Sequence, residues 1–144
     1  MPWISYTAPS IPRAKVEDLL RQALQQAAQQ ICLNPRRVLL LPPDITRMHS
    51  GAGWITEYLY HLLKDSCDVH VIPTLGQHEP HTPEQNRQMF GSIPNERIHA
   101  HDWRDGCVKV GELSAEYVKQ VTGGVADWPF PIVLNRMLME EKWD

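Results

Sequence analysis

Residues 36–47 read Arg-Arg-Val-Leu-Leu-Leu-Pro-Pro-Asp-Ile-Thr-Arg, and this stretch decides the fold class. A short, continuous apolar run is typical of a strand in a parallel sheet that is covered on its faces. The two prolines end the run because proline lacks the N–H that a strand ladder needs. The sequence therefore predicts a strand at residues 36–41, with a polar loop from Asp44 to Gly51 at its carboxyl end.

The same order of strand and polar loop returns at residues 68–73, Asp-Val-His-Val-Ile-Pro, which lead into a polar turn over residues 74–81. Apolar residues at helical spacing predict helices over residues 15–32 and 53–64. Thr82-Pro83-Glu84 opens a third, short helix with an N-cap, a proline and an acid. This alternation predicts an α/β fold of three layers, with a mostly parallel sheet and helices on both faces.

The rest of the chain is less regular. Short strands are expected at residues 97–101 and 108–110, whereas residues 114–124 give no clear pattern. The apolar residues 132–139 resemble a helix that leads toward a further strand. We therefore expect one domain over residues 1–144, without an internal boundary, that is incomplete because it is truncated.

Composition bounds the function. The chain has 144 residues, of which 42% are hydrophobic and 22% charged, which is typical of a globular protein. A net charge of −3 gives no electrostatic argument for binding nucleic acid or an anionic membrane. No apolar run approaches the ~20 residues of a membrane span, and residues 1–6 lack the features of a signal peptide. Cys32, Cys67 and Cys107 are odd in number and far apart, which favours free thiols in a reducing cytoplasm.

Two polar loops carry the candidate chemistry. Ligands of open α/β sheets bind outside the carboxyl ends of the strands, where loops of neighbouring parallel strands lie side by side. Arg47 can bind a carboxylate through two parallel hydrogen bonds, and His78 can transfer protons near neutral pH. Asp44 can orient either of them, Thr46 offers a hydroxyl, and Gly76 permits a tight turn. The predicted site consists of Asp44, Thr46, Arg47, Gly76, Gln77 and His78.

Plainer interpretations stay open for these residues. Asp44 and Thr46 are ordinary turn residues, and Arg47 and His78 are also common on solvated loops. His78 and His81 have the spacing of a metal-binding pair without a third ligand, so we predict no metal site within this chain. Histidines 99 and 101 would share one face of a strand, for which we favour a structural role. The chain has no glycine-rich phosphate loop.

The two loops together resemble the lactate racemase family, whose members use a nickel-pincer nucleotide. Residues 39–47 contain Asp44-Ile45-Thr46-Arg47, which is similar to the family's Asp-x-Thr-Arg motif. Residues 71–84 are similar to its second segment, Gly-x-His-x-Pro followed by Thr-x-x-Glu. Residues 101–113 are a weaker match, and the resemblance covers roughly residues 35–115.

The resemblance implies a racemase or epimerase. In the family, a hydride moves between the α-carbon of a 2-hydroxy acid and the cofactor, while histidines exchange the hydroxyl proton. His78 matches one of the two proton-transferring histidines, and Asp44 and Arg47 match groups that line the cofactor and substrate site. Ile45 and Met48 depart from the family's usual His and Pro, and Gly-Gln-His-Glu-Pro replaces Gly-Phe-His-Arg-Pro. These departures point to a substrate other than lactate, another 2-hydroxy acid or a sugar acid.

The family's cofactor-tethering lysine, nickel-binding histidine and second catalytic histidine lie farther along its sequences than this chain reaches. The resemblance therefore implies that the chain is the first part of the family's N-terminal domain. Its partner would be the missing C-terminal part of the parent protein, and the isolated chain would be inactive.

Two other functions remain open from the sequence. The chain could be a binding module for a small anionic metabolite, which needs only Arg47 and the crevice beside it. It could also be an oligomerising subunit, because its five tryptophans and an exposed sheet edge would suit an interface.

Overall fold

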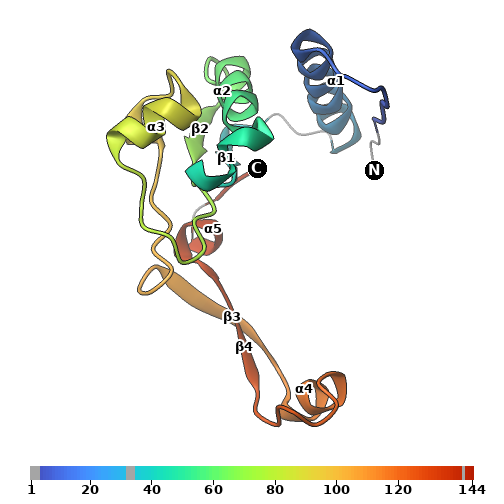
Figure 1. Cartoon of the computed structure of the whole chain (residues 1–144), viewed down its shortest axis with the longest axis vertical. Coiled ribbons are helices and arrows are strands. Elements are labelled where there is room, and N and C mark those ends of the chain that lie inside the picture. Colours follow the sequence, from blue (N-terminus) through green and yellow to red (C-terminus); the bar gives the residue numbers. More distant parts are fainter. Residues whose placement is uncertain (1–3, 32–34, 141) are drawn as a thin grey trace. The chain divides into compact units, whose positions relative to one another are not determined.

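A computed structural model of the chain describes residues 4–31, 35–140 and 142–144 (Figure 1). Their contacts divide the chain into two compact units, one of Met1–Ala100 with Trp143–Asp144 and the other of His101–Lys142. We describe each unit by itself. The expected single domain over residues 1–144 stays a prediction.

The first unit is built on a small parallel sheet. Strand β1 (Arg37–Leu40) pairs in parallel with β2 (Asp68–Val71), and their first and last residues are partners. The pairing continues past the strands, because the Thr74 N–H donates to the Pro42 carbonyl over 2.8 Å. The α/β fold class, both strands and their parallel pairing are confirmed.

One face of this sheet forms the core. Alternation along the strands turns Val38 and Leu40 of β1 and Val69 and Val71 of β2 to the same face. Val69 and Val71 belong to the main apolar cluster, and the partly buried Val38 and Leu40 pack against it. Helices α2 (Ala52–Leu63) and α3 (Pro83–Phe90) add Tyr60, Met89 and Phe90 to it. Val71 and Phe90 are fully buried, so the carboxyl end of β2 is held firmly in the core.

The predicted helices are confirmed. Helix α1 (Arg13–Ile31) and α2 lie within two residues of their expected bounds. Helix α3 begins as predicted, because the Thr82 side chain and Gln85 form a reciprocal capping box ahead of Pro83. Cys32, which we expected at the end of the first helix, lies outside the described residues.

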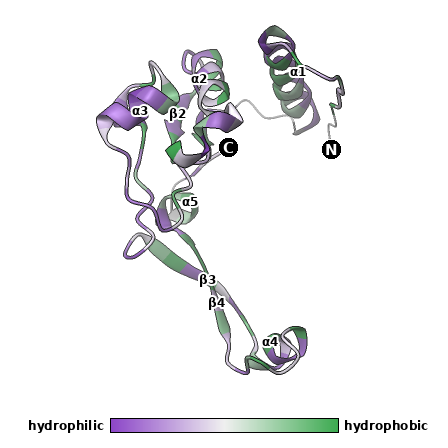
Figure 2. Ribbon diagram, in the orientation of Figure 1, coloured by the Kyte–Doolittle hydropathy of each residue, from purple (hydrophilic) through white to green (hydrophobic). Residues whose placement is uncertain are grey.

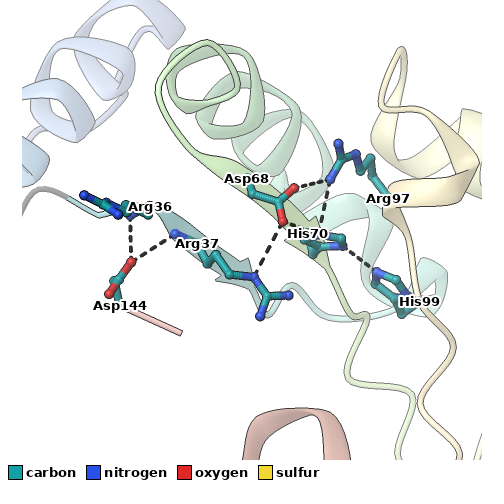
Figure 3. A network of polar contacts seen from close by, with 7 residues as sticks. All are labelled: Arg36, Arg37, Asp68, His70, Arg97, His99 and Asp144. Atoms are coloured by element: carbon teal, nitrogen blue, oxygen red, sulfur yellow. Dashed lines mark hydrogen bonds and ion pairs between the residues drawn. The ribbon is translucent and has the colours of Figure 1, made fainter. Parts of the chain in front are cut away.

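The opposite face of the sheet carries a polar network (Figure 3). Asp68 accepts hydrogen bonds or ion pairs from Arg37, His70 and Arg97, and His70 Nδ1 lies 2.7 Å from His99 Nε2. Hydrogen bonding by Arg97, and then by His70, lowers the pKa of Asp68 below its ordinary value. We expected a second layer of helices on this face of the sheet. Among the described residues of this unit, the face instead carries the charged side chains around Asp68.

The strand expected at residues 97–101 is wrong. Residues Asn95–Arg97 form a 3-10 turn, and only Ile98 makes a parallel bridge, to Val71. The His99 N–H donates to the Val71 carbonyl over 2.8 Å. Pro94 sets up the turn, and one bridge at the edge of β2 is all that the segment contributes to the sheet.

The second unit is an antiparallel hairpin. Strand β3 (Cys107–Leu113) pairs with β4 (Phe130–Asn135), and α4 (Ala115–Val121) lies between them in sequence. The short strand predicted at residues 108–110 is therefore confirmed and longer than expected. Antiparallel pairing was not predicted, because it depends on the return strand.

The helix expected over residues 132–139 is only partly right. Residues 132–135 belong to β4, and helix α5 is confined to Arg136–Glu140. The β-branched pair Ile132 and Val133 favours a strand, and β3 supplies the hydrogen-bonding partner. Figure 2 shows hydrophobic residues along this hairpin, and Val125, at 85% exposure, and Trp128, at 58%, lie in the connection before β4.

None of the described helices is long and apolar enough to cross a membrane. Cys67 and Cys107 are free thiols, half-buried, as expected. The Cys67 Sγ lies 3.2 Å from the Pro35 carbonyl oxygen, to which it can donate.

Packing of α2 on α3 should be sensitive to Gly53. A Cβ at this position would lie 2.0 Å from the Met89 carbonyl oxygen, which is backbone and cannot turn aside. Gly53→Ala should therefore lower the free energy of unfolding by about 1–3 kcal/mol, although alanine is the better helix former. Chemical denaturation measures this change. A variant as stable as the wild type would contradict the close approach of the two helices.

Candidate functional site

The two predicted loops lie side by side at the carboxyl ends of β1 and β2. Pro43 and Thr74 form a parallel bridge there, which continues the register of the strands into the loops. Between the loops lies an open cleft of about 440 Å³. All six predicted site residues line it, and the full lining is Pro43, Asp44, Thr46, Arg47, Thr74, Leu75, Gly76, Gln77 and His78.

Asp44 and His78 form a hydrogen-bonded pair in this cleft. His78 Nδ1 lies 2.5 Å from Asp44 Oδ2. The other carboxylate oxygen, Oδ1, accepts from the Thr46 hydroxyl at 2.6 Å and from the Thr46 N–H at 3.2 Å. Asp44 is only 4% exposed, so its orientation is fixed from both oxygens.

The charge of Asp44 is maintained by these donors. Burial by itself raises the pKa of this carboxyl, but the hydrogen bonds from Thr46 and His78 outweigh it. The pKa of Asp44 therefore lies below its ordinary value, and the group is a carboxylate at neutral pH.

An ionised Asp44 sets the tautomer of His78. A carboxylate only accepts hydrogen bonds, so His78 Nδ1 carries the proton and the neutral ring keeps Nε2 bare. The His78 side chain is 61% exposed, which leaves Nε2 accessible from the cleft. A bare ring nitrogen beside an oriented carboxylate can accept a proton from a bound hydroxyl group.

Gly76 gives the second loop its turn. Its φ is +59°, in the left-handed region that favours glycine. The turn is closed by the His78 N–H, which donates to the Leu75 carbonyl over 3.0 Å. Leu75 is 3% exposed and anchors the turn in the core, so the backbone that carries His78 is held in place.

Arg47 supplies a positive charge to the same cleft. It lies in the 3-10 segment Ile45–Ser50, where its φ of −103° and ψ of 22° depart from helical values. The residue is exposed, and within the described parts of the chain its guanidinium makes no hydrogen bond or ion pair. Its donors are therefore available to an anion. Gln77 is exposed in the loop opposite.

His81 is the residue of this site that sequence reasoning missed, since we considered it only as a metal ligand. The Ile45 N–H donates to His81 Nε2 over 2.9 Å, so the histidine binds the loop of Asp44 from behind. The sequence held no signal for this contact, because the partner of His81 is a backbone N–H in a distant loop. Among the described residues there is no group of three His, Cys, Asp or Glu side chains that could hold a metal ion.

Histidines 99 and 101 do not share a strand face, contrary to expectation. His99 contacts His70 in the first unit, with their rings stacked at 4.9 Å. His101 accepts from Asn135 Nδ2 over 2.8 Å in the second unit. The chain leaves the sheet after Ile98, so residues 99–101 have no strand to share.

The comparisons with known proteins follow this geometry. A sequence model of the family described as lactate racemase N-terminal domain matches residues 5–138. A crystal structure of a Thermotoga maritima protein is similar, with a TM-score of 0.69 and 24% identity over 87% of this chain. At this identity the likeness shows the fold alone, and the match covers 31% of that protein's chain. No curated protein matches the chain.

The family match spans almost the whole chain and includes both loops of the cleft. The chain belongs to the lactate racemase N-terminal domain family.

Proposed function

We propose that this chain supplies the proton-transferring histidine and the anion-binding arginine of a racemase or epimerase acting on a 2-hydroxy acid. The observation that carries the proposal is the pairing of His78 with the buried carboxylate of Asp44, in one cleft with Arg47. A 2-hydroxy acid has a carboxylate and a neighbouring hydroxyl, and the cleft offers one group for each.

The arginine and the histidine would act on different parts of the substrate. The Arg47 guanidinium would bind the carboxylate, because bidentate, charge-assisted bonds fix both position and orientation. His78 Nε2 would accept the hydroxyl proton as the alcohol becomes a ketone, and would return it when the alcohol re-forms.

Asp44 would assist His78 in both directions. When Nε2 takes up a proton, the ring becomes a cation whose Nδ1–H already points at a carboxylate, and this charge pairing stabilises it. Because Asp44 is held by Thr46 as well, it does not have to reorient when the ring becomes charged.

The family resemblance implies a nickel-pincer nucleotide as the hydride acceptor. The described residues do not provide a ligand set for its metal, because they contain no suitable cluster of His, Cys, Asp or Glu. The steps proposed here therefore use only the side chains of this chain, and the cofactor belongs to the proposal for the whole protein. The chain's match spans 31% of the length of the Thermotoga maritima relative.

Binding of short 2-hydroxy acids should depend on Arg47. In a panel of short 2-hydroxy acids that includes D- and L-lactate and glycerate, Arg47→Ala should weaken the binding of the acid that the wild type binds most tightly. The loss should be about tenfold or more, because a charge-assisted pair of hydrogen bonds is removed. Calorimetric titration of the chain measures this affinity. Arg87→Ala is the matched control, since Arg87 pairs with Glu84 on α3 outside the cleft. Equal affinities of Arg47→Ala and wild type would contradict the assignment of Arg47.

Removing the charge of Asp44 should reduce stability in a pH-dependent way. The folded pKa of Asp44 is depressed, so its contribution is present above the unfolded pKa of about 3.9 and is lost as the pH falls through the folded pKa. Asp44→Asn should therefore lower the free energy of unfolding by about 1–3 kcal/mol at pH 7. The gap between the two proteins should close below about pH 4.

Urea denaturation at a series of pH values measures this gap. The control is Asp65→Asn, an exposed carboxyl outside the cleft, which should change stability at pH 7 by less than about 0.5 kcal/mol. A gap for Asp44→Asn that does not change with pH would mean that the carboxylate's charge is not what stabilises the pair.

Two other roles stay as alternatives. Binding of a 2-hydroxy acid that needs Arg47, without interconversion of the enantiomers of that acid by the protein that carries this domain, would favour a binding module. The exposed apolar side chains of the β3–β4 hairpin, such as Val133 and Phe130, favour an oligomerising role. Light scattering tests the latter, and a monomer at high concentration would contradict it.

A further inference from the structure

His81 is held on three sides. Its Nε2 accepts the Ile45 N–H at 2.9 Å, and its Nδ1 lies 3.1 Å from Asn86 Oδ1. Its ring stacks on Phe90 with centroids 5.9 Å apart and an angle of 27° between the planes. Phe90 is fully buried and Asn86 is 9% exposed, so two of the three contacts belong to the rigid interior of α3.

The contacts define the protonation of this ring. A backbone N–H can only donate, so His81 Nε2 is bare and Nδ1 carries the proton that Asn86 Oδ1 accepts. Asn86 in turn donates from Nδ2 to Asn95 Oδ1 over 3.1 Å, which agrees with the same amide orientation. Both nitrogens of His81 are therefore occupied, and neither is available to a metal or a substrate.

The contact with Ile45 connects α3 to the loop that carries Asp44. Ile45 directly follows Asp44, and its N–H belongs to the peptide bond that joins the two residues. Thr46 fixes the Asp44 carboxylate from the same loop, so its donors move with that loop. The hydrogen bond from Ile45 to His81 is instead an anchor from another element, because α3 starts at the Thr82 cap beside His81.

We propose that His81 is a positioning residue, which fixes the Asp44 loop so that the Asp44 carboxylate meets His78 Nδ1. His81 does not line the cleft and acts only through Ile45 and Asp44. The proposal rests on the proposed function in one respect only, that the Asp44–His78 pair is the reacting group.

Three variants of His81 separate this role from simple packing. His81→Leu keeps the apolar stacking on Phe90 and removes both polar ends. In His81→Asn the side chain is too short to reach Ile45, but its amide lies near the position of Nδ1 and can still bond Asn86. This variant is therefore the milder change. His81→Gln places an acceptor oxygen near the position of Nε2 and should restore the bond. His61→Leu is the matched control, because His61 bonds Ser92 away from the cleft.

The readouts are made on the full chain by nuclear magnetic resonance. Exchange of the Ile45 amide should accelerate about tenfold in His81→Leu and His81→Asn, because its acceptor is lost. The imidazole ¹⁵N shifts of His78 should change from the Nδ1–H tautomer toward a mixture of both tautomers. His81→Gln and His61→Leu should keep both signals of the wild type. The affinity for the acid of the 2-hydroxy acid panel that the wild type binds most tightly, measured on the same samples, should fall with the loss of the tautomer signal.

Two results would overturn the proposal. One is an unchanged His78 tautomer in folded His81→Leu or, if that variant does not fold, in His81→Asn. The other is a change of equal size in His61→Leu. Failure of the proposed function is seen separately, since it would appear as no binding of any acid in the 2-hydroxy acid panel by the wild type while the His78 signals still respond to His81.

Discussion

The parallel register of β1 and β2, carried past the ends of the strands, is the constraint on which the site depends. The hydrogen bond from the Thr74 N–H to the Pro42 carbonyl keeps the two segments paired beyond the strands, where the polar loops begin. Asp44 lies two residues after Pro42 in the loop that follows β1, and His78 lies four residues after Thr74 in the loop that follows β2. A slip of one residue would turn every side chain of the strand to the opposite face and would remove Val69 and Val71 from the core. Core packing therefore also fixes which loop residues can meet.

A buried carboxylate is acceptable here because its donors are local. Asp44 caps the segment Ile45–Ser50 and receives two bonds from Thr46, which make good much of the hydration that it loses. His78 completes this shell and gains a fixed tautomer from it. Asp44 and Thr46 thus stabilise the loop and also fix the tautomer of the His78 ring. The Asp-x-Thr spacing serves both purposes. The opposite face of the sheet uses Asp68 differently, since its partners there are two arginines and a histidine (Figure 3).

Local patterns predicted what local interactions determine. The apolar run before Asp44, the helical stripe of α2 and the Thr82 cap all follow from neighbouring residues, and each was correct in type and place. The convergence of Asp44 with His78 followed from the parallel rule, which needs only that the two strands be neighbours. The antiparallel pairing of β3 and β4 was not predictable in the same way, because residues 132–135 become a strand only when β3 pairs with them. The role of His81 was missed because its partner, the Ile45 N–H, is a backbone group that no side-chain motif reveals.

His78 and His81 lie three positions apart, and their burial and hydrogen-bond partners give the two rings different properties. Both rings carry the proton on Nδ1, and for the same reason, since each Nδ1 faces an oxygen acceptor. They differ at Nε2, which is accessible in His78 and accepts a backbone N–H in His81. A ring nitrogen that already accepts a hydrogen bond cannot take up a substrate proton without breaking it, so only His78 can cycle between its neutral and charged forms at no cost to the fold. Under the proposed function, the number of unoccupied ring nitrogens, rather than the motif spacing, is therefore what separates the proton-transfer role of His78 from the positioning role of His81.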